Sequence, residues 1–206
     1  QYTRLMGAEI VMIVDPIESR LKVAQKYGAT EIFAGMASDA YGFVEENTDG
    51  NLADVVFDAT GHFSVFPIAL KLTRRFGNLI LIGDSPHPSK QTLTADVLTR
   101  QITVRGTHNE LMPPHIENWS VTRQMNLFYT YINRRQMDVE NLITETYSPV
   151  EAPDGTAALP KTKFSVIIST STVGFPLESN ICRATILLIL AIYFLLEIFS
   201  INWSYR

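Results

Sequence analysis

The sequence predicts an α/β protein built on a doubly wound parallel sheet. Short, continuously apolar runs bounded by turn residues recur along the first half of the chain, which is typical of strands that helices cover on both faces. Stretches with helical spacing of apolar residues lie between these runs. This alternation of strand and helix requires parallel strands joined by right-handed crossovers. The predicted strands are residues 9–14, 31–33, 53–57, 78–82 and 102–105.

The predicted helices are marked by their apolar faces and by the residues that bound them. Pro16 opens a helix that stops at Gly28, since proline suits the first turn of a helix and glycine its end. A second helix carries Phe66 and Phe76 on one face and stops at Gly77.

Composition excludes several kinds of partner and site. With a net charge of −4 and no basic run longer than a pair, the chain lacks the basic surface that nucleic acids require. The single cysteine, Cys182, excludes an internal disulfide framework and indicates a reducing compartment, so we expect a cytoplasmic protein. The histidines fall in separate loops with no cysteine nearby, and we predict no metal site from them. They are His62, His87, His108 and His115.

Asp15 links the predicted fold to a ligand. It ends the first predicted strand, at the edge where a dinucleotide-binding fold holds a ribose through an acidic side chain. In the Rossmann fingerprint this acid follows the first glycine of G-x-G-x-x-G by about 20 residues, so that loop would lie before Gln1. Residues 1–6 are interpreted as the last turns of the helix after the loop, with Gly7 as its stop. We therefore expect a Rossmann-like fold that is incomplete at the N-terminus.

Several stretches also share an order and a spacing. They are residues 15–29, 54–61, 77–83 and 102–107. Together they resemble the coenzyme-binding domain of the medium-chain, zinc-type alcohol dehydrogenase family, over roughly residues 1–150. The resemblance implies an NAD-binding domain without its glycine-rich loop, and it implies that zinc lies only on a catalytic domain absent from this sequence.

On the adenosine side, the resemblance assigns roles to Asp15 and Arg20. Asp15 would accept hydrogen bonds from the ribose hydroxyls and favour NAD over NADP by repelling a 2′-phosphate. Its structural alternative is to cap the helix that Pro16 opens. Arg20 would lie along the adenine edge, or it is a solvated helix arginine.

Further cofactor contacts are implied at the ends of the next three strands. Thr60 and Gly61 would allow close approach of the cofactor. The pairs Ile82-Gly83 and Gly106-Thr107 would flank the nicotinamide ring. For all three pairs the structural alternative is an ordinary tight turn. The positions are Thr60, Gly61, Ile82, Gly83, Gly106 and Thr107.

The leading hypothesis is the coenzyme-binding part of an NAD-dependent, zinc-type alcohol or polyol dehydrogenase. Its reaction would be hydride transfer between a small-molecule alcohol and nicotinamide. No catalytic or metal-binding residue is assigned within this chain, and the isolated chain is expected to be inactive. The spacing also predicts an amphipathic helix over 119–134 and a strand over 142–144, and that strand could extend the sheet edge in a homo-oligomer.

Two other functions remain open at this point. An S-adenosylmethionine-dependent methyltransferase also holds a ribose with an acid after its second strand, but its last strand is antiparallel, so the direction of the strand at 102–105 discriminates. A non-enzymatic Rossmann module tethered to a membrane would depend on the C-terminal part of the chain.

Residues 151–206 fit the pattern worst and are interpreted as a degenerate tail. From residue 184 to 201 the chain is almost wholly apolar, which approaches the roughly 20 residues that span a bilayer. Trp203 could then sit at the membrane interface. Because Pro160 already breaks the helix expected here, we favour an aberrant coding sequence, whose hydrophobicity is accidental, over a membrane anchor.

Overall fold

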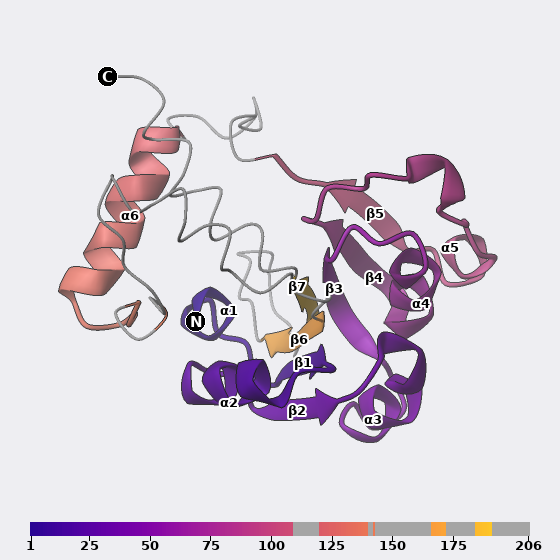
Figure 1. The fold of residues 1–206 in the computed structure, drawn as a ribbon, viewed down its shortest axis with the longest axis horizontal. Coiled ribbons are helices and arrows are strands. Elements are labelled where there is room, and N and C mark those ends of the chain that lie inside the picture. Colours follow the sequence, from indigo (N-terminus) through magenta and orange to yellow (C-terminus); the bar gives the residue numbers. More distant parts are fainter. Residues whose placement is uncertain (109–119, 140–141, 143–165, 172–183, 191–206) are drawn as a thin grey trace, which may run out of the picture. The chain divides into compact units, whose positions relative to one another are not determined.

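The computed structural model describes residues 1–108, 120–139, 142, 166–171 and 184–190 of the chain (Figure 1). The chain separates into two compact units. One consists of Gln1–Leu111 with Phe164–Arg206, and the other is Met112–Lys163.

The first unit is built on a seven-stranded sheet with the strand order β2-β1-β6-β7-β3-β4-β5. The strands predicted from the apolar runs are present as β1 to β5, and each neighbouring pair among them is parallel. Their bounds are β1 Val11–Asp15, β2 Glu31–Ala34, β3 Ala53–Ala59, β4 Thr73–Leu81 and β5 Thr103–Gly106. The predicted doubly wound sheet is therefore confirmed. The methyltransferase alternative predicts that the strand at 102–105 is antiparallel. This strand, β5, is parallel to β4, which favours the dehydrogenase.

Short helices connect these strands. Figure 1 shows α2 near β1 and β2 and α4 near β3 and β4. The helices are α1 Tyr2–Leu5, α2 Glu18–Lys26, α3 Tyr41–Glu46, α4 Val65–Leu72 and α5 Asp96–Thr99, with 3₁₀ turns η1 Ala37–Asp39 and η2 Pro88–Lys90. The predicted stop at Gly7 is seen as a left-handed residue with φ +92° after α1.

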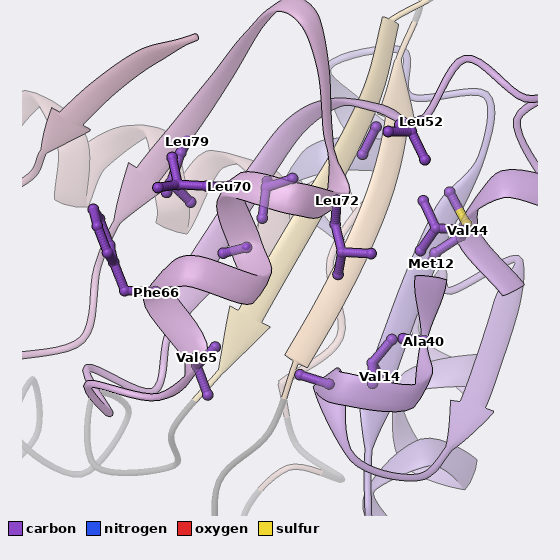
Figure 2. Packing of buried hydrophobic residues seen from close by; sticks show 14 of the residues in the cluster. Met12, Val14, Ala40, Val44, Leu52, Val65, Phe66, Leu70, Leu72 and Leu79 are labelled. Atoms are coloured by element: carbon purple, nitrogen blue, oxygen red, sulfur yellow. The ribbon is translucent and has the colours of Figure 1, made fainter. Parts of the chain in front are cut away.

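The side chains of β1 alternate between two apolar clusters, as the period of a strand requires. Met12 and Val14 belong to the larger cluster, which includes Leu70 of α4 (Figure 2). Val11 and Ile13 belong to a second cluster, with Leu21 of α2. The sheet is thus covered on both faces, and each fully buried leucine in these clusters contributes about 1.5–3 kcal/mol of transfer free energy.

Between β1 and β3 the sheet contains two strands that the sequence pattern did not predict. They are β6 Val166–Ser171 and β7 Ala184–Leu190. β7 runs parallel to both β1 and β3, whereas β6 runs antiparallel to both. In a Rossmann sheet, with order 3-2-1-4-5-6, the first strand holds this central position. Part of the apolar segment interpreted as an accidental tail or a membrane anchor therefore forms a strand at the centre of the sheet.

The prediction that Phe76 belongs to the second helix is wrong. α4 ends at Leu72, and β4 begins one residue later because Thr73 pairs with Ala53 of β3. Phe76 lies in β4 with φ +59° and is 62% exposed. The apolar spacing of α4 continues past the end of the helix, but pairing with β3 makes the following residues a strand.

In the second unit the described helix is α6 Val121–Asn133. The hydroxyl of Ser120 accepts a hydrogen bond from the Arg123 N–H at 3.2 Å and so caps the helix. This agrees with the helix predicted over 119–134. Leu142, placed in a predicted strand, instead donates its N–H to the oxygen of Val139 at 3.0 Å, while residues 143–144 lie outside the described part. Among the described residues, no helix is both long and apolar enough for a membrane span.

Candidate functional site

The residues predicted to contact a cofactor come together at one edge of the sheet. Because β1, β3, β4 and β5 share one direction through their parallel partners, their carboxyl ends meet at that edge. Asp15 ends β1, and the three other predicted pairs stand at or directly after the ends of β3, β4 and β5. In open α/β sheets this edge is the place where ligands bind.

The carboxylate of Asp15 is engaged within the protein. Its Oδ1 accepts a hydrogen bond from the main-chain N–H of Ile17 at 2.8 Å, in the turn that leads into α2. Its Oδ2 lies 3.5 Å from Nη1 of Arg20, and the two side chains are only 2% and 15% exposed. Asp15 thus fixes the turn before α2, but the predicted alternative that it caps the helix is wrong, because the N-cap is Ile17 and no side chain caps it. Arg20 is an ion-pair partner of Asp15 rather than a solvated arginine.

Asp58 organises the turn after β3, a role that was not predicted from the sequence. One carboxylate oxygen, Oδ1, accepts hydrogen bonds from the Thr60 N–H at 2.9 Å, the Thr60 hydroxyl at 2.7 Å and the Gly61 N–H at 3.3 Å. The residue is 1% exposed. Burial raises the pKa of the Asp58 carboxyl, although the hydrogen bonds from Thr60 and Gly61 act in the opposite direction. An acid two or three residues before a Thr-Gly turn was the available signal.

Gly61 and Gly83 are required by contact between two turns. Gly61 has φ +61°, and a Cβ added to it would overlap the main-chain oxygen of Asp84. A Cβ on Gly83 would lie 2.6 Å from the main-chain oxygen of Ala59. Gly61, predicted to allow close approach of a cofactor, and Gly83, predicted to flank the nicotinamide ring, therefore both have a packing role within the protein.

The end of β5 is fixed to β4 through Thr107. Both the N–H and the hydroxyl of Thr107 donate to the oxygen of Leu81, at 3.1 and 2.9 Å. Gly106 differs from Gly61 and Gly83, because a Cβ at this position would meet no atom of the described residues within 4 Å. Packing among the described residues thus gives no reason for a glycine at 106.

Two of the predicted loop histidines are linked by an aromatic contact. The ring of His62 stacks on Phe63 with centroids 4.4 Å apart, and Phe63 meets His87 edge-on at 6.4 Å. Nζ of Lys90 lies 5.3 Å from the centroid of the Phe63 ring. The sequence could not pair these loops. In the described part of the chain no three potential metal-ligating side chains gather in one place.

The parallel strands, the covering helices and the acid at the end of β1 together define a Rossmann-like α/β domain. The sequence model of the family described as zinc-binding dehydrogenase matches residues 1–120, and the chain belongs to this family. The recognition made from the strand-end motifs is therefore confirmed.

Curated relatives are dehydrogenases that are considerably longer than this chain. L-threonine 3-dehydrogenase of Symbiobacterium thermophilum is 30% identical over 126 residues, covering 61% of this chain and 34% of the relative. D-arabitol-phosphate dehydrogenase of Enterococcus avium is 26% identical over 181 residues, covering 87% and 46%. The chain thus spans less than half the length of either relative.

Solved structures agree on the fold. An alcohol dehydrogenase zinc-binding domain protein from Burkholderia ambifaria superposes with a TM-score of 0.63 and 21% identity, over 75% of this chain and 40% of that one. At this identity the likeness shows the Rossmann-like fold alone.

Proposed function

We propose that this chain supplies the NAD-binding part of a zinc-type alcohol or polyol dehydrogenase. The observation that carries the proposal is the gathering of Asp15, the Thr60-Gly61 turn and the Ile82-Gly83 turn at the carboxyl ends of β1, β3 and β4, which run in one direction within the same sheet. Family membership adds the reaction type, hydride transfer between an alcohol and nicotinamide, which the bound cofactor supplies when present.

Asp15 is proposed to select NAD. A carboxylate at the end of β1 can accept hydrogen bonds from the ribose hydroxyls and disfavours a 2′-phosphate. Arg20 weakens this charge effect, because its guanidinium already lies 3.5 Å from the Asp15 carboxylate. Since the Asp15 side chain is 2% exposed, it must be uncovered before a ribose can reach it, and we expect weak binding by the chain as it stands.

The main-chain groups of the other strand ends are proposed to contact the rest of the dinucleotide. Thr60 and Gly61 would lie on its adenosine side. The pairs Ile82-Gly83 and Gly106-Thr107 would flank the nicotinamide ring. Gly106 is the clearest candidate for a glycine retained for a ligand, because no atom in the described part of the chain lies within 4 Å of its Cβ position.

Zinc does not fit the described residues, because no group of three ligating side chains occurs among them. We therefore derive no step through zinc. The substrate is proposed to be a small-molecule alcohol, in keeping with relatives named for threonine and for arabitol phosphate. A reducing, cytoplasmic setting suits this chemistry.

Self-association is proposed to involve the β5 edge. All four residues of β5 are exposed, and Val104 is 37% exposed at the end of the sheet. An uncovered edge strand offers unpaired main-chain groups to a second copy. Light scattering on the intact enzyme should give more than one copy per particle.

NAD selection can be tested on the full chain by saturation-transfer-difference NMR with NAD and NADP as probes. NAD should bind better than NADP, and Asp15→Asn should reduce that preference, because it keeps an acceptor for the Ile17 N–H while removing the charge. Asp15→Ala should weaken NAD binding by about 1–3 kcal/mol.

Glu46→Gln provides the matched control, since it removes one carboxylate from an exposed position at the end of α3. It should leave the binding of both nucleotides unchanged. Equal affinity of the unmutated chain for NAD and NADP would contradict the role of Asp15.

A further inference from the structure

Asp58 connects the two turns that carry half of the candidate cofactor contacts. Its side-chain Oδ1 accepts three hydrogen bonds from Thr60 and Gly61, at 2.7 to 3.3 Å. Its main-chain oxygen accepts the N–H groups of Ile82 and Gly83, at 2.8 and 3.0 Å. One residue thus holds the turn after β3 and the end of β4 at the same time.

The arrangement continues beyond the first turn. The hydroxyl of Thr60, which donates to Asp58, in turn accepts the His62 N–H at 3.1 Å. His62 precedes α4, and its ring Nδ1 lies 2.7 Å from the hydroxyl of Ser64. The chain from Asp58 to the start of α4 is therefore fixed by short local hydrogen bonds that begin at one carboxylate.

Contact between the turns makes their positions interdependent. The Cβ position of Gly61 is blocked by the main chain at Asp84, and that of Gly83 by the main chain at Ala59. The two turns are therefore in main-chain contact, and a displacement of one towards the other would produce a steric overlap. A residue that fixes Thr60 and Gly61 consequently also fixes the position of Gly83.

Structure alone does not demand a carboxylate in this place. Oδ2 of Asp58 is buried and has no hydrogen-bond partner among the described residues, so the fold bears the cost of a buried polar atom. An uncharged residue would avoid that cost if Asp58 served only the core. The one function of the side chain that the described contacts reveal is to hold the Thr60-Gly61 turn.

We propose that Asp58 is a positioning residue of the dinucleotide site, which sets the Thr60-Gly61 and Ile82-Gly83 turns in the arrangement that a dinucleotide contacts. The inference rests on the proposed function, and it assigns Asp58 no contact with the cofactor itself. Its effect on binding passes through the turns.

The first test needs no ligand. Amide hydrogen exchange in the full chain should accelerate at Thr60 and Gly61 by about tenfold or more in Asp58→Ala, because their side-chain acceptor is lost. The effect at Gly83 should be smaller, since its N–H donates to the main-chain oxygen of residue 58, which the variant keeps. Asp58→Asn keeps an acceptor oxygen and should restore most of the protection. Unchanged exchange at Thr60 and Gly61 in Asp58→Ala would overturn the proposal.

The second test uses NAD as the probe and follows amide chemical shifts by NMR. Asp58→Ala should bind NAD about tenfold more weakly, and Asp58→Asn should bind nearly as well as the unmutated chain. Full NAD affinity in a folded Asp58→Ala chain would show a role in folding only and would also overturn the proposal. If NAD causes no shifts in the unmutated chain, the proposed function fails, and the exchange experiment still decides whether Asp58 positions the turns.

Three further variants serve as controls. Two at Thr60 guard against misfolding of Asp58→Ala, and one at Asp84 guards against a general charge effect. If Asp58→Ala does not fold, Thr60→Val removes one donor to Asp58 while Thr60→Ser keeps it, and only the valine variant should accelerate exchange at Gly61. Asp84→Asn removes an exposed carboxylate from the adjoining turn and should change neither exchange nor NAD binding. Equal effects of Asp84→Asn and Asp58→Ala would contradict a specific role for Asp58.

Discussion

Gly61 and Asp84 are in main-chain contact, so close that a Cβ on the glycine would overlap the Asp84 carbonyl oxygen. The contact joins the turn after β3 to the turn after β4. It explains why a glycine stands at the end of β3 without reference to any ligand. The strand ends at the same edge of the sheet carry all of the predicted cofactor contacts except Arg20, so packing and the proposed binding involve the same few residues.

Alanine substitutions of three strand-end glycines should therefore have unequal effects. Gly61→Ala should lower the free energy of unfolding by about 2 kcal/mol or more, since it adds both a steric overlap and a left-handed φ that disfavours a side chain. Gly83→Ala should cost a similar amount through its contact with Ala59. Gly106→Ala is the matched control and should cost less than about 0.5 kcal/mol. Chemical denaturation measures all three, and equal losses would contradict the packing account.

An ion pair between a buried carboxylate and a partly exposed arginine provides a second test, at the start of β4. Nη2 of Arg74 lies 2.6 Å from Oδ1 of Asp54, whose side chain is 5% exposed. Arg74→Ala would leave that carboxylate buried without its cation. Because the Arg74 side chain is 39% exposed and solvent screens part of the interaction, we expect a loss of about 1–3 kcal/mol. The neighbouring exposed Arg75 supplies the control, since Arg75→Ala should change the unfolding free energy by less than about 0.5 kcal/mol.

Stability should depend on pH through Asp58. Burial raises the pKa of this carboxyl in the folded state, so the folded state prefers the protonated acid. The stability that Asp58 contributes is then fully present below the ordinary aspartate pKa of about 3.9 and is lost as pH rises through the raised folded value. Asp58→Asn does not titrate and avoids this loss.

The measurement is the difference in unfolding free energy between Asp58→Asn and the unmutated chain, followed from pH 3.5 to 7. Relative to the unmutated chain, the asparagine variant should become more stable as pH rises, and the difference should then level off. Asp84→Asn, at an exposed position nearby, should show no such trend. A difference that moves towards the unmutated chain with rising pH would mean that the folded pKa of Asp58 is lowered.

The sequence predicts what depends on local pattern. Apolar runs and turn residues predicted β1 to β5 and their parallel order, and the position of Asp15 at a strand end indicated the edge of the sheet where the site is proposed. Phe76 was misplaced because its spacing continues the apolar face of α4, whereas pairing with β3 decides its conformation. Contacts between loops, such as Phe63 with His87, depend on tertiary structure and leave no local signal. The buried role of Asp58 was missed for the same reason.

Residues 184–190 are the clearest case in which tertiary context decides. Their apolar composition suits a membrane span, an accidental extension or a buried strand, and composition alone cannot separate these. In the structure they form β7, whose Ile186 is the register partner of Val55 in β3. A buried central strand is normally apolar along its whole length, which suits this segment.

The placement of β7 can be tested by cross-linking. In a Cys182→Ser background, Val55→Cys with Ile186→Cys should form a disulfide on mild oxidation, because partner Cα atoms on paired strands fall within the usual range for a disulfide. Val55→Cys with Leu190→Cys is the matched control, since Leu190 is the partner of Ala59, four residues along β3. Peptide mapping should find the bond in the first variant and not in the second.

Removal of the chain after residue 180 gives the complementary result. If β7 completes the sheet, deletion takes a hydrogen-bonded neighbour from both β1 and β3, and the midpoint of thermal unfolding should fall by several degrees. If the segment is an accidental extension, the midpoint should stay the same and solubility should improve, because exposed apolar residues promote aggregation. Partition of the full chain into carbonate-resistant membranes would contradict both and favour an anchor. An unchanged midpoint together with equal cross-linking of the two cysteine pairs would remove β7 from the sheet.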